Sequence, residues 1–193
     1  MKDFFKMKGA PEMLDLLMKR RSIRNFKNKE IEKEKIQKIT NAALLSPSSK
    51  NNNPWKFLIV QEKELLSELS KAKLHGSQFV ADAPLVFVFL ADPEQSDVWI
   101  EDCSIAATII VLAAQSLDLG SCWVQIRKRE GSGGLNSEKY IKEKLNIPDN
   151  LRVLCMVAIG YPDEKKSEKQ IPEEKLNDIY FNRFGDLWIN NIY

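Results

Sequence analysis

The chain has 193 residues, 44% of them hydrophobic, which is enough to bury one sizeable core. Lysine and arginine total 29 against 27 for aspartate and glutamate, so the net charge of +2 argues against general attraction to nucleic acid or to an acidic membrane surface. The first residues lack the pattern of a signal peptide, and no apolar run reaches the length of a membrane span. We therefore expect one soluble, cytoplasmic domain over residues 1–193, in which any anion site is local.

Helices and strands alternate from the N-terminus onward. Pro11 suits a first helical turn, and apolar residues at helical spacing follow it up to Lys19. A second helix is expected over residues 36–46, because Pro47 disfavours its continuation. After a polar stretch, residues 55–60 (WKFLIV) are rich in aromatic and β-branched side chains and predict a strand.

The later segments follow in mixed order. They are a helix over residues 62–73, a strand over 84–91, a helix over 102–120 ended by glycine, a strand over 121–125, a helix over 137–145 and a strand over 152–160. The helix over 102–120 is apolar nearly all round, so it must be covered on most faces. The mixed order favours an α+β fold over a doubly wound parallel sheet.

The cysteines and the single histidine exclude several kinds of chemistry. Cys103, Cys122 and Cys155 lack C-x-x-C spacing and have apolar neighbours, which is typical of buried free thiols in a reducing compartment. A zinc site built from these cysteines and His75 is possible by count, but the isolated spacing disfavours it. No nucleophile turn accompanies His75, so we do not expect a hydrolase.

Positive side chains gather in the stretch KRRSIRNF, which begins where the first helix is expected to end. One interpretation is a solvated helix end, where cations complement the negative pole of the helix dipole and hold no ligand. The other is a phosphate site, because the guanidinium groups of Arg20, Arg21 and Arg24 beside the Ser22 hydroxyl offer parallel donors to phosphate oxygens. Nucleic acid is a poorer candidate, because it would need a longer basic face with aromatic platforms.

A second polar stretch, SPSSKNNNPW, connects the second helix to the first strand. Serine, asparagine and proline are turn residues, and a connecting turn explains much of this composition. The density of groups that both donate and accept goes further, because Asn51 and Asn53 together with Ser48 and Ser49 suit a heterocycle with alternating carbonyl and N–H groups. A pyrimidine-like edge beside a phosphate site indicates flavin mononucleotide (FMN).

Four stretches resemble the FMN-dependent nitroreductase family in their order and spacing. They are RRSIRNF, SPSSKNNNPWKFLIV, the apolar helix led by Asp102 that runs into LDLGSCWV, and VAIGYP, and together they extend from about Met13 to Pro162. The resemblance implies a nitroreductase-like α+β fold, with a central, mostly antiparallel sheet surrounded by helices. It also implies an intertwined homodimer with FMN at the subunit interface, and residues 163–193 as a C-terminal extension that packs on the partner subunit.

The resemblance also assigns residues to the flavin. Those implied to hold the phosphate, the ribityl chain and the pyrimidine side are Arg20, Arg21, Ser22 and Arg24. Those implied to reach the flavin from the other subunit are Pro47, Ser48, Ser49, Asn51 and Asn53. Two departures from the family pattern concern Asn53, which stands where glutamine is frequent, and Lys169, which is the candidate replacement for a basic pair near the C-terminus.

The chemistry that the resemblance implies is hydride transfer through flavin N5. NADH or NADPH reduces the flavin and is replaced in the same pocket by a small-molecule oxidant such as a nitroaromatic, a quinone or an enone, in a ping-pong mechanism. Arg21 is the first candidate for the cation that favours flavin reduction. Cys122 and Trp123 lie either near the flavin or in the core. The alternative function is an FMN-binding protein that stores or senses flavin without rapid turnover.

Overall fold

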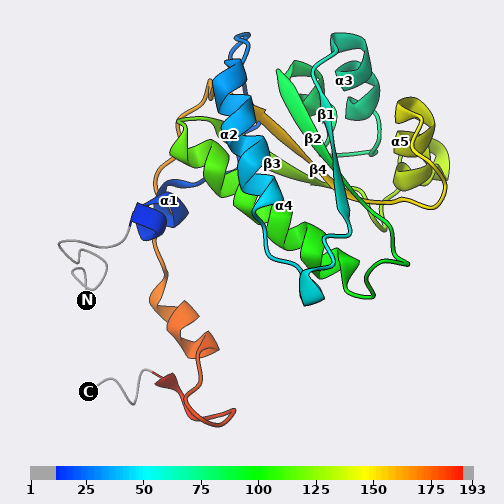
Figure 1. The fold of residues 1–193 in the computed structure, drawn as a ribbon. Helices are drawn as coiled ribbons and strands as arrows, with labels where there is room; N and C mark the ends of the chain where they lie inside the picture. Colours follow the sequence, from blue (N-terminus) through cyan, green and yellow to red (C-terminus); the bar gives the residue numbers. More distant parts are fainter. Residues whose placement is uncertain (1–11, 189–193) are drawn as a thin grey trace.

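The computed structural model describes residues 12–188 and contains a four-stranded sheet at its centre (Figure 1). The strands are β1 (Trp55–Val60), β2 (Leu85–Ala91), β3 (Gly120–Gln125) and β4 (Arg152–Gly160), in the order β1-β2-β4-β3. Every neighbouring pair is antiparallel. The predicted α+β class and antiparallel sheet are confirmed, while the helical turn expected at Pro11 lies outside the described residues.

Helices cover both faces of this sheet. On one face, α2 (Lys33–Leu44) and α4 (Trp99–Ser116) enclose a core with the inward side chains of all four strands, while α1 (Glu12–Lys19) packs on α4. On the other face lie α3 (Lys63–Ser70) and α5 (Ser137–Leu145), which build a second core. The sheet is therefore the middle of three layers, and its fully buried strand β2 is apolar throughout because both of its faces are covered.

Short 3-10 turns occupy several of the connections. Their bounds are Ser49–Asn51 (η1), Gln78–Asp82 (η2), Ser132–Gly134 (η3) and Glu173–Asp178 (η4). Within residues 12–188, α4 alone is long and apolar enough to cross a membrane by length and composition. Many residues of this helix are buried in the core instead, and Cys103, Ala107 and Ile110 are at 0% exposure.

The predicted end of the long apolar helix was wrong. The helix begins at Trp99 and ends at Ser116, whereas the sequence predicted Asp102 and Gly120 as its limits. Asp118, at φ 60°, takes the left-handed position that a glycine usually occupies after a helix. Gly120 is instead the first residue of β3. Aspartate tolerates left-handed backbone, so the turn did not need the glycine.

Gly120 has a different role, which it shares with Gly160 across the β3–β4 ladder. The two glycines are direct partners in the register. A Cβ atom on Gly120 would lie 2.8 Å from the Ile23 Cβ, and one on Gly160 would lie 2.7 Å from the Pro84 Cδ and 2.8 Å from the Phe26 Cδ1. The absence of two side chains therefore provides the space in which the segment after α1 packs against the sheet.

This segment, residues 20–26, runs along the outer edge of β3 and is called the basic segment below. The Ile23 N–H donates to the Ser121 carbonyl at 3.0 Å, and a parallel bridge pairs Ser22 with Ser121. At its far end, Phe26 forms an antiparallel bridge with Pro162. The arginines are thereby held by the backbone at the sheet edge.

After β4 the chain returns toward α1 and then extends away from the three-layered body (Figure 1). The Lys169 N–H donates to the Met18 carbonyl at 2.9 Å, which ties this segment to the end of α1. Beyond it, large apolar side chains are exposed, and Phe184 reaches 90% exposure. Two aromatic pairs, Tyr180–Phe184 and Phe181–Trp188, pack within the extension itself.

The close approach at Gly120 generates the first prediction. Gly120→Ala should lower the free energy of unfolding by about 1–3 kcal/mol, because the added methyl group collides with Ile23. Urea unfolding of the single variant and of the Gly120→Ala/Ile23→Ala double variant measures the coupling. The double variant should lose less than the sum of the two single losses. Strict additivity would contradict the packing described for this glycine.

Candidate functional site

A small hollow of about 200 Å³ lies where the end of α1, the middle of α4 and the edge of β3 meet. The basic segment contributes its polar side, and the helices and strand contribute mainly apolar walls. The lining residues are Leu17, Arg20, Ser22, Thr108, Val111, Leu112, Ser121 and Trp123. Apolar walls with a few convergent polar groups are typical of small-molecule sites.

Arg20 is the cation that lines this hollow, and Arg24 and Lys166 lie near the adjoining strand β3. All three act on the Cys122 thiol, whose pKa they lower while burial, the stronger influence, raises it. The guanidinium of Arg24 lies 5.8 Å from the centre of the Phe79 ring. Within residues 12–188, no carboxylate forms an ion pair with Arg20 or Arg24. Two guanidinium groups are therefore available to an external anion.

Glu164 and Lys166 brace the basic segment from the C-terminal side. The Glu164 carboxylate accepts hydrogen bonds from the backbone N–H groups of Arg24 at 2.6 Å and Asn25 at 3.2 Å. Lys166 donates to the Ser22 carbonyl at 2.6 Å and pairs with Glu164 at 3.1 Å. The bond from the Arg24 N–H is the main reason that the pKa of Glu164 is lowered. The segment that carries the arginines is thus fixed by a charged clamp.

The other two predicted basic residues, Arg21 and Lys169, differ in their contacts. The Arg21 guanidinium donates to the Ser167 carbonyl, which connects the basic segment to the start of the extension. The Lys169 side chain is exposed and makes no hydrogen bond or ion pair with any residue in 12–188. Lys166, which the sequence did not single out, is the lysine that reaches the predicted cluster.

The predicted serines and asparagines form a compact loop, residues 47–53, called the polar loop below. The Ser48 hydroxyl donates to the Asn53 side-chain oxygen and accepts from the Asn53 N–H, both at 3.0 Å. The Asn53 amide nitrogen donates to the Asn51 carbonyl at 3.1 Å. The Ser49 N–H donates to the Asp102 carboxylate at 2.8 Å. Pro47 and Asn51 are exposed, so the outer side of the loop is accessible.

The structure does not bring the polar loop and the basic segment together within one chain. The loop is bonded to Asp102 near the start of α4, whereas the hollow is lined by Thr108, Val111 and Leu112 farther along the same helix. The helical rise of 1.5 Å per residue places Asp102 and Val111 about 14 Å apart along the axis. The two predicted halves of the site therefore occupy different parts of α4.

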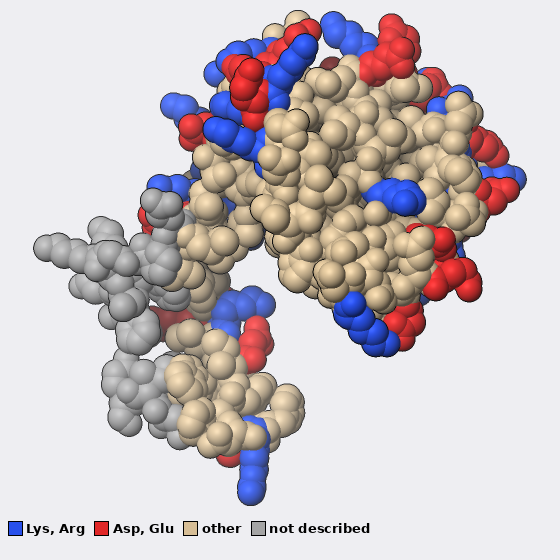
Figure 2. Space-filling view, viewed as in Figure 1, with Lys and Arg blue, Asp and Glu red and all other residues tan. Residues whose placement is uncertain are grey.

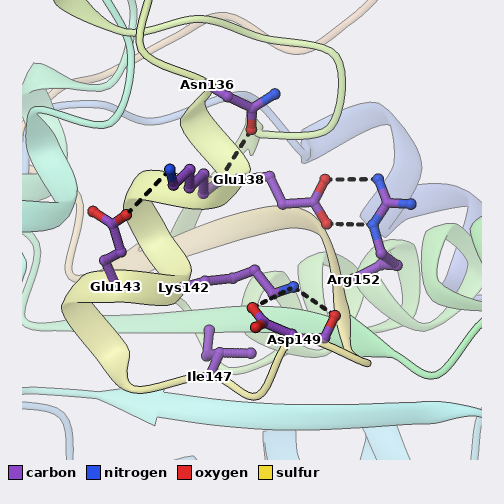
Figure 3. A pocket seen from close by; sticks show the side chains of 8 residues that line it. Asn136, Glu138, Lys142, Glu143, Ile147, Asp149 and Arg152 are labelled. Carbon is purple, nitrogen blue, oxygen red and sulfur yellow. Dashed lines mark hydrogen bonds and ion pairs between the residues drawn. The ribbon is translucent and has the colours of Figure 1, made fainter.

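A larger hollow of about 530 Å³ lies beside α5, but its charged groups are already paired (Figure 3). The Arg152 guanidinium donates to both carboxylate oxygens of Glu138, at 2.7 and 2.9 Å. Burial raises the pKa of Glu138, but the bonds from Arg152 and from the Val153 N–H outweigh it and leave the pKa lowered. Lys142 donates to the Asp149 carbonyl at 2.9 Å. This hollow is a less suitable ligand site because its cations are neutralised internally.

Comparison with known proteins decides the family. A model of the nitroreductase family matches residues 17–77 and 69–161, and the two matches together cover most of the chain. The chain belongs to the nitroreductase family. The matched residues include the basic segment, the polar loop, α4 and both strands that carry the paired glycines. The family resemblance expected from the sequence is confirmed.

Three relatives of this nitroreductase match 80–94% of its chain. An FMN-dependent nitroreductase from Clostridium difficile R20291 is 46% identical, with a TM-score of 0.84 over 89% of this chain and 99% of that chain. A candidate NADH dehydrogenase/NAD(P)H nitroreductase of Archaeoglobus fulgidus is 39% identical over 80% of this chain and 88% of its own length. The structure of an NADPH:FMN oxidoreductase from Vibrio harveyi complexed with NAD+ is 25% identical, with a TM-score of 0.75 over 94% and 82% of the two chains. These similarities confirm the predicted fold and enzyme class.

Two residues of the charged clamp in this nitroreductase were missed from sequence. Glu164 and Lys166 belong to the run DEKKSEK, whose mixed charges are typical of a solvated surface. Nothing in their spacing shows that the chain after β4 returns to residues 22–25. The sequence signal that could have found them is their position directly after the last strand, VAIGYP. A chain that leaves this strand can reach the basic segment, which lies on the edge of the neighbouring strand β3.

The lowered pKa of Glu164 generates the second prediction. A carboxylate with a lowered pKa stabilises the fold above its ordinary value of 4.5, and this contribution is lost as the pH falls through the folded-state pKa. Glu164→Gln should therefore lower the melting temperature at pH 7 by about 2–4 °C, a modest loss because the carboxylate is partly exposed. Thermal unfolding between pH 3 and pH 7, about the range that spans ordinary carboxyl titration, should show the difference shrinking in acid.

Glu168→Gln is the matched control for this measurement. Glu168 is exposed, lies four positions along the same segment and has no hydrogen bond within residues 12–188, so its substitution should leave the melting temperature unchanged. A Glu164→Gln difference that stays constant across the pH range would contradict the clamp.

Proposed function

We propose that the chain is an FMN-dependent NAD(P)H oxidoreductase that reduces nitroaromatic, quinone or enone acceptors by a ping-pong mechanism. The observation that carries this proposal is that Arg20, which lines the hollow with Ser22, and Arg24, in the same segment, have guanidinium groups without a carboxylate partner within residues 12–188. A cluster of fixed positive charge at the edge of an apolar hollow suits a ligand with a phosphate at one end and an aromatic body at the other.

The residues present fit FMN in their chemistry. Arg20 and Arg24 supply charge-assisted donors for the phosphate, and the Ser22 hydroxyl supplies a neutral one. Trp123, half-buried in the wall of the hollow, supplies apolar surface, and its ring nitrogen donates to Gln125 at 3.0 Å. Arg21 and Lys169 remain in the proposed set, because Arg21 in the basic segment is bonded to Ser167 of the returning chain that carries Lys169.

When bound, FMN supplies the hydride chemistry, accepting electrons from NADH or NADPH and delivering them to the oxidant. The chain's own contribution is to bind the flavin, to orient it and to polarise its ring. A cation near the flavin ring favours electron uptake, and Arg21 is the proposed group. Within residues 12–188, the exposed His75 and the buried thiols do not assemble a nucleophile with a base, so the proposed reaction does not require covalent catalysis by the protein.

We further propose that two copies of the chain share each flavin, with the polar loop of one subunit reaching the basic segment of the other. The loop is bonded to α4 at Asp102, and the residues of α4 that line the hollow of the same chain lie about 9–15 Å farther along the helix axis. Figure 2 shows a broad uncharged surface on the side of α2 and α4. Leu44 and Leu45 at the end of α2, and Ile105 in α4, are exposed at 62%, 82% and 41%. An apolar face of this kind, together with the extension after residue 163, is typical of an obligate dimer.

Arginine variants test the FMN site. Arg20→Ala and Arg24→Ala should each weaken FMN binding about tenfold or more, because a charge-assisted bond to phosphate contributes about 1.5–3 kcal/mol. Titration of the apoprotein with FMN measures the affinity, and thermal unfolding checks that the fold is intact. Lys19→Ala is the matched control, because Lys19 is adjacent to Arg20, exposed and not part of the hollow, and it should bind FMN normally.

The wild-type protein separates the two candidate functions in the same experiment. It should be yellow, release FMN on denaturation, and oxidise NADH or NADPH when a quinone or nitroaromatic is added. FMN binding without such turnover would favour the storage or sensing function. A colourless protein that cannot be reconstituted with FMN, or unchanged affinity in both arginine variants, would contradict the proposed site.

A mixed dimer tests whether the site is shared. Arg20→Ala and Asn51→Ala homodimers should each bind FMN poorly, because every site carries one defect. The isolated heterodimer should recover binding at about half of its sites, because symmetry places both defects in one site and leaves the other intact. Flavin content per dimer measures the recovery. If a folded, paired heterodimer had no intact site, Arg20 and Asn51 would serve the flavin from the same chain.

A further inference from the structure

Asp102 is a buried carboxylate that the proposed chemistry does not use. Only 2% of the residue is exposed, and it lies near the start of α4. One carboxylate oxygen accepts the Ser49 N–H at 2.8 Å, and the other accepts the hydroxyl of the buried Ser96 at 2.9 Å. Buried charge is unfavourable unless it is hydrogen-bonded, so these two contacts are what makes a carboxylate stable at this position.

The polar loop depends on support from outside itself. Lys50, Asn51 and Asn53 have φ angles of 51°, 57° and 47°, in the left-handed region that residues other than glycine adopt at a cost. Such backbone persists only where the surroundings hold it. Within residues 12–188, the bond from the Ser49 N–H to Asp102 is the one hydrogen bond that joins residues 47–53 to another element.

We propose that Asp102 is a positioning residue, which fixes the conformation of the polar loop and thereby completes the FMN site of the partner subunit. The proposal rests on the proposed function, because the loop acts on FMN only if the shared site exists. Asp102 does not need to touch the flavin. It holds the Ser49 N–H from within the rigid helix α4, and the loop presents its exposed side from that point. The buried helix and the accessible loop are thereby linked through one charged contact.

Variants at Asp102 test the proposal with two separate measurements. Asp102→Ala should speed hydrogen exchange of the Ser49 amide in the FMN-free protein by about tenfold or more, because that amide loses its acceptor. The same variant should weaken FMN binding by about tenfold or more, the effect of one charge-assisted hydrogen bond. Asp102→Asn should restore most of both, because its side chain can still accept from Ser49 while donating to Ser96.

Two further variants separate positioning from general loss of stability. Ser96→Ala removes the other bond to the carboxylate, so it should leave the Ser49 amide protected. Ser49→Pro removes both the backbone donor and the hydroxyl, whereas Ser49→Ala removes the hydroxyl alone, so the difference between them isolates the backbone donor. Ser48, at φ −137° and ψ 159°, already has the conformation preferred before proline. Ser49→Pro should weaken FMN binding more than Ser49→Ala does, and this comparison remains available if Asp102→Ala does not fold.

Each result has a definite meaning. Unchanged exchange at Ser49 in Asp102→Ala, or faster exchange with unchanged FMN affinity, would overturn the positioning role. Equal FMN affinity in Ser49→Pro and Ser49→Ala would overturn it as well. Failure of the proposed function is recognised separately, because the wild-type protein itself would then not bind FMN.

Discussion

The position of the basic segment depends on a close approach between backbone and side chains at two paired glycines. Gly120 and Gly160 face each other across β3 and β4, and the space that their missing side chains leave is filled by Ile23 and Phe26. Because these two apolar residues are fixed on the sheet, the arginines between and before them follow the strand edge. The packing of Ile23 and Phe26 against these two glycines therefore determines where the arginine side chains lie along the sheet edge.

The charged clamp completes what packing begins. Glu164 accepts hydrogen bonds from backbone N–H groups of the basic segment, and Lys166 donates one to the Ser22 carbonyl. These bonds satisfy backbone groups at a strand edge that would otherwise face solvent, and they leave the guanidinium groups of Arg20 and Arg24 without carboxylate partners in residues 12–188. The hollow beside α5 is the opposite case, because Arg152 is held by both oxygens of Glu138. Unpaired cations, rather than cavity size, distinguish the candidate site.

Helix α4 relates the two halves of the site. Its apolar side chains are buried on several sides, which gives it a fixed place against the sheet, and its length spans the hollow at one part and the polar loop at another. A rigid helix of this kind fixes the relative positions of groups that do not touch each other. The separation along the helix also explains why the loop and the arginines act together only across two copies of the chain in the proposed site.

The sequence by itself determined the element types, the α+β class and the family. These follow from apolar periodicity, from β-branched runs such as residues 55–60, and from motifs whose residues stand close together in the chain. It also predicted that Arg20 and Arg24 form part of an anion site, because positive side chains are dense in KRRSIRNF and guanidinium groups suit phosphate oxygens. Helix ends were less certain, since Asp118 and Gly120 were both able to follow a helix.

Only the tertiary structure decided the contacts between distant segments. The space that Gly120 provides is visible only once Ile23 lies on it, and Lys166 joins the cluster only because the chain after β4 turns back. Asp102 was one acidic residue at the head of an apolar run until the fold buried it against the Ser49 N–H. Sequence patterns report local preference, whereas these contacts depend on packing between segments more than fifty residues apart, which local preference does not encode.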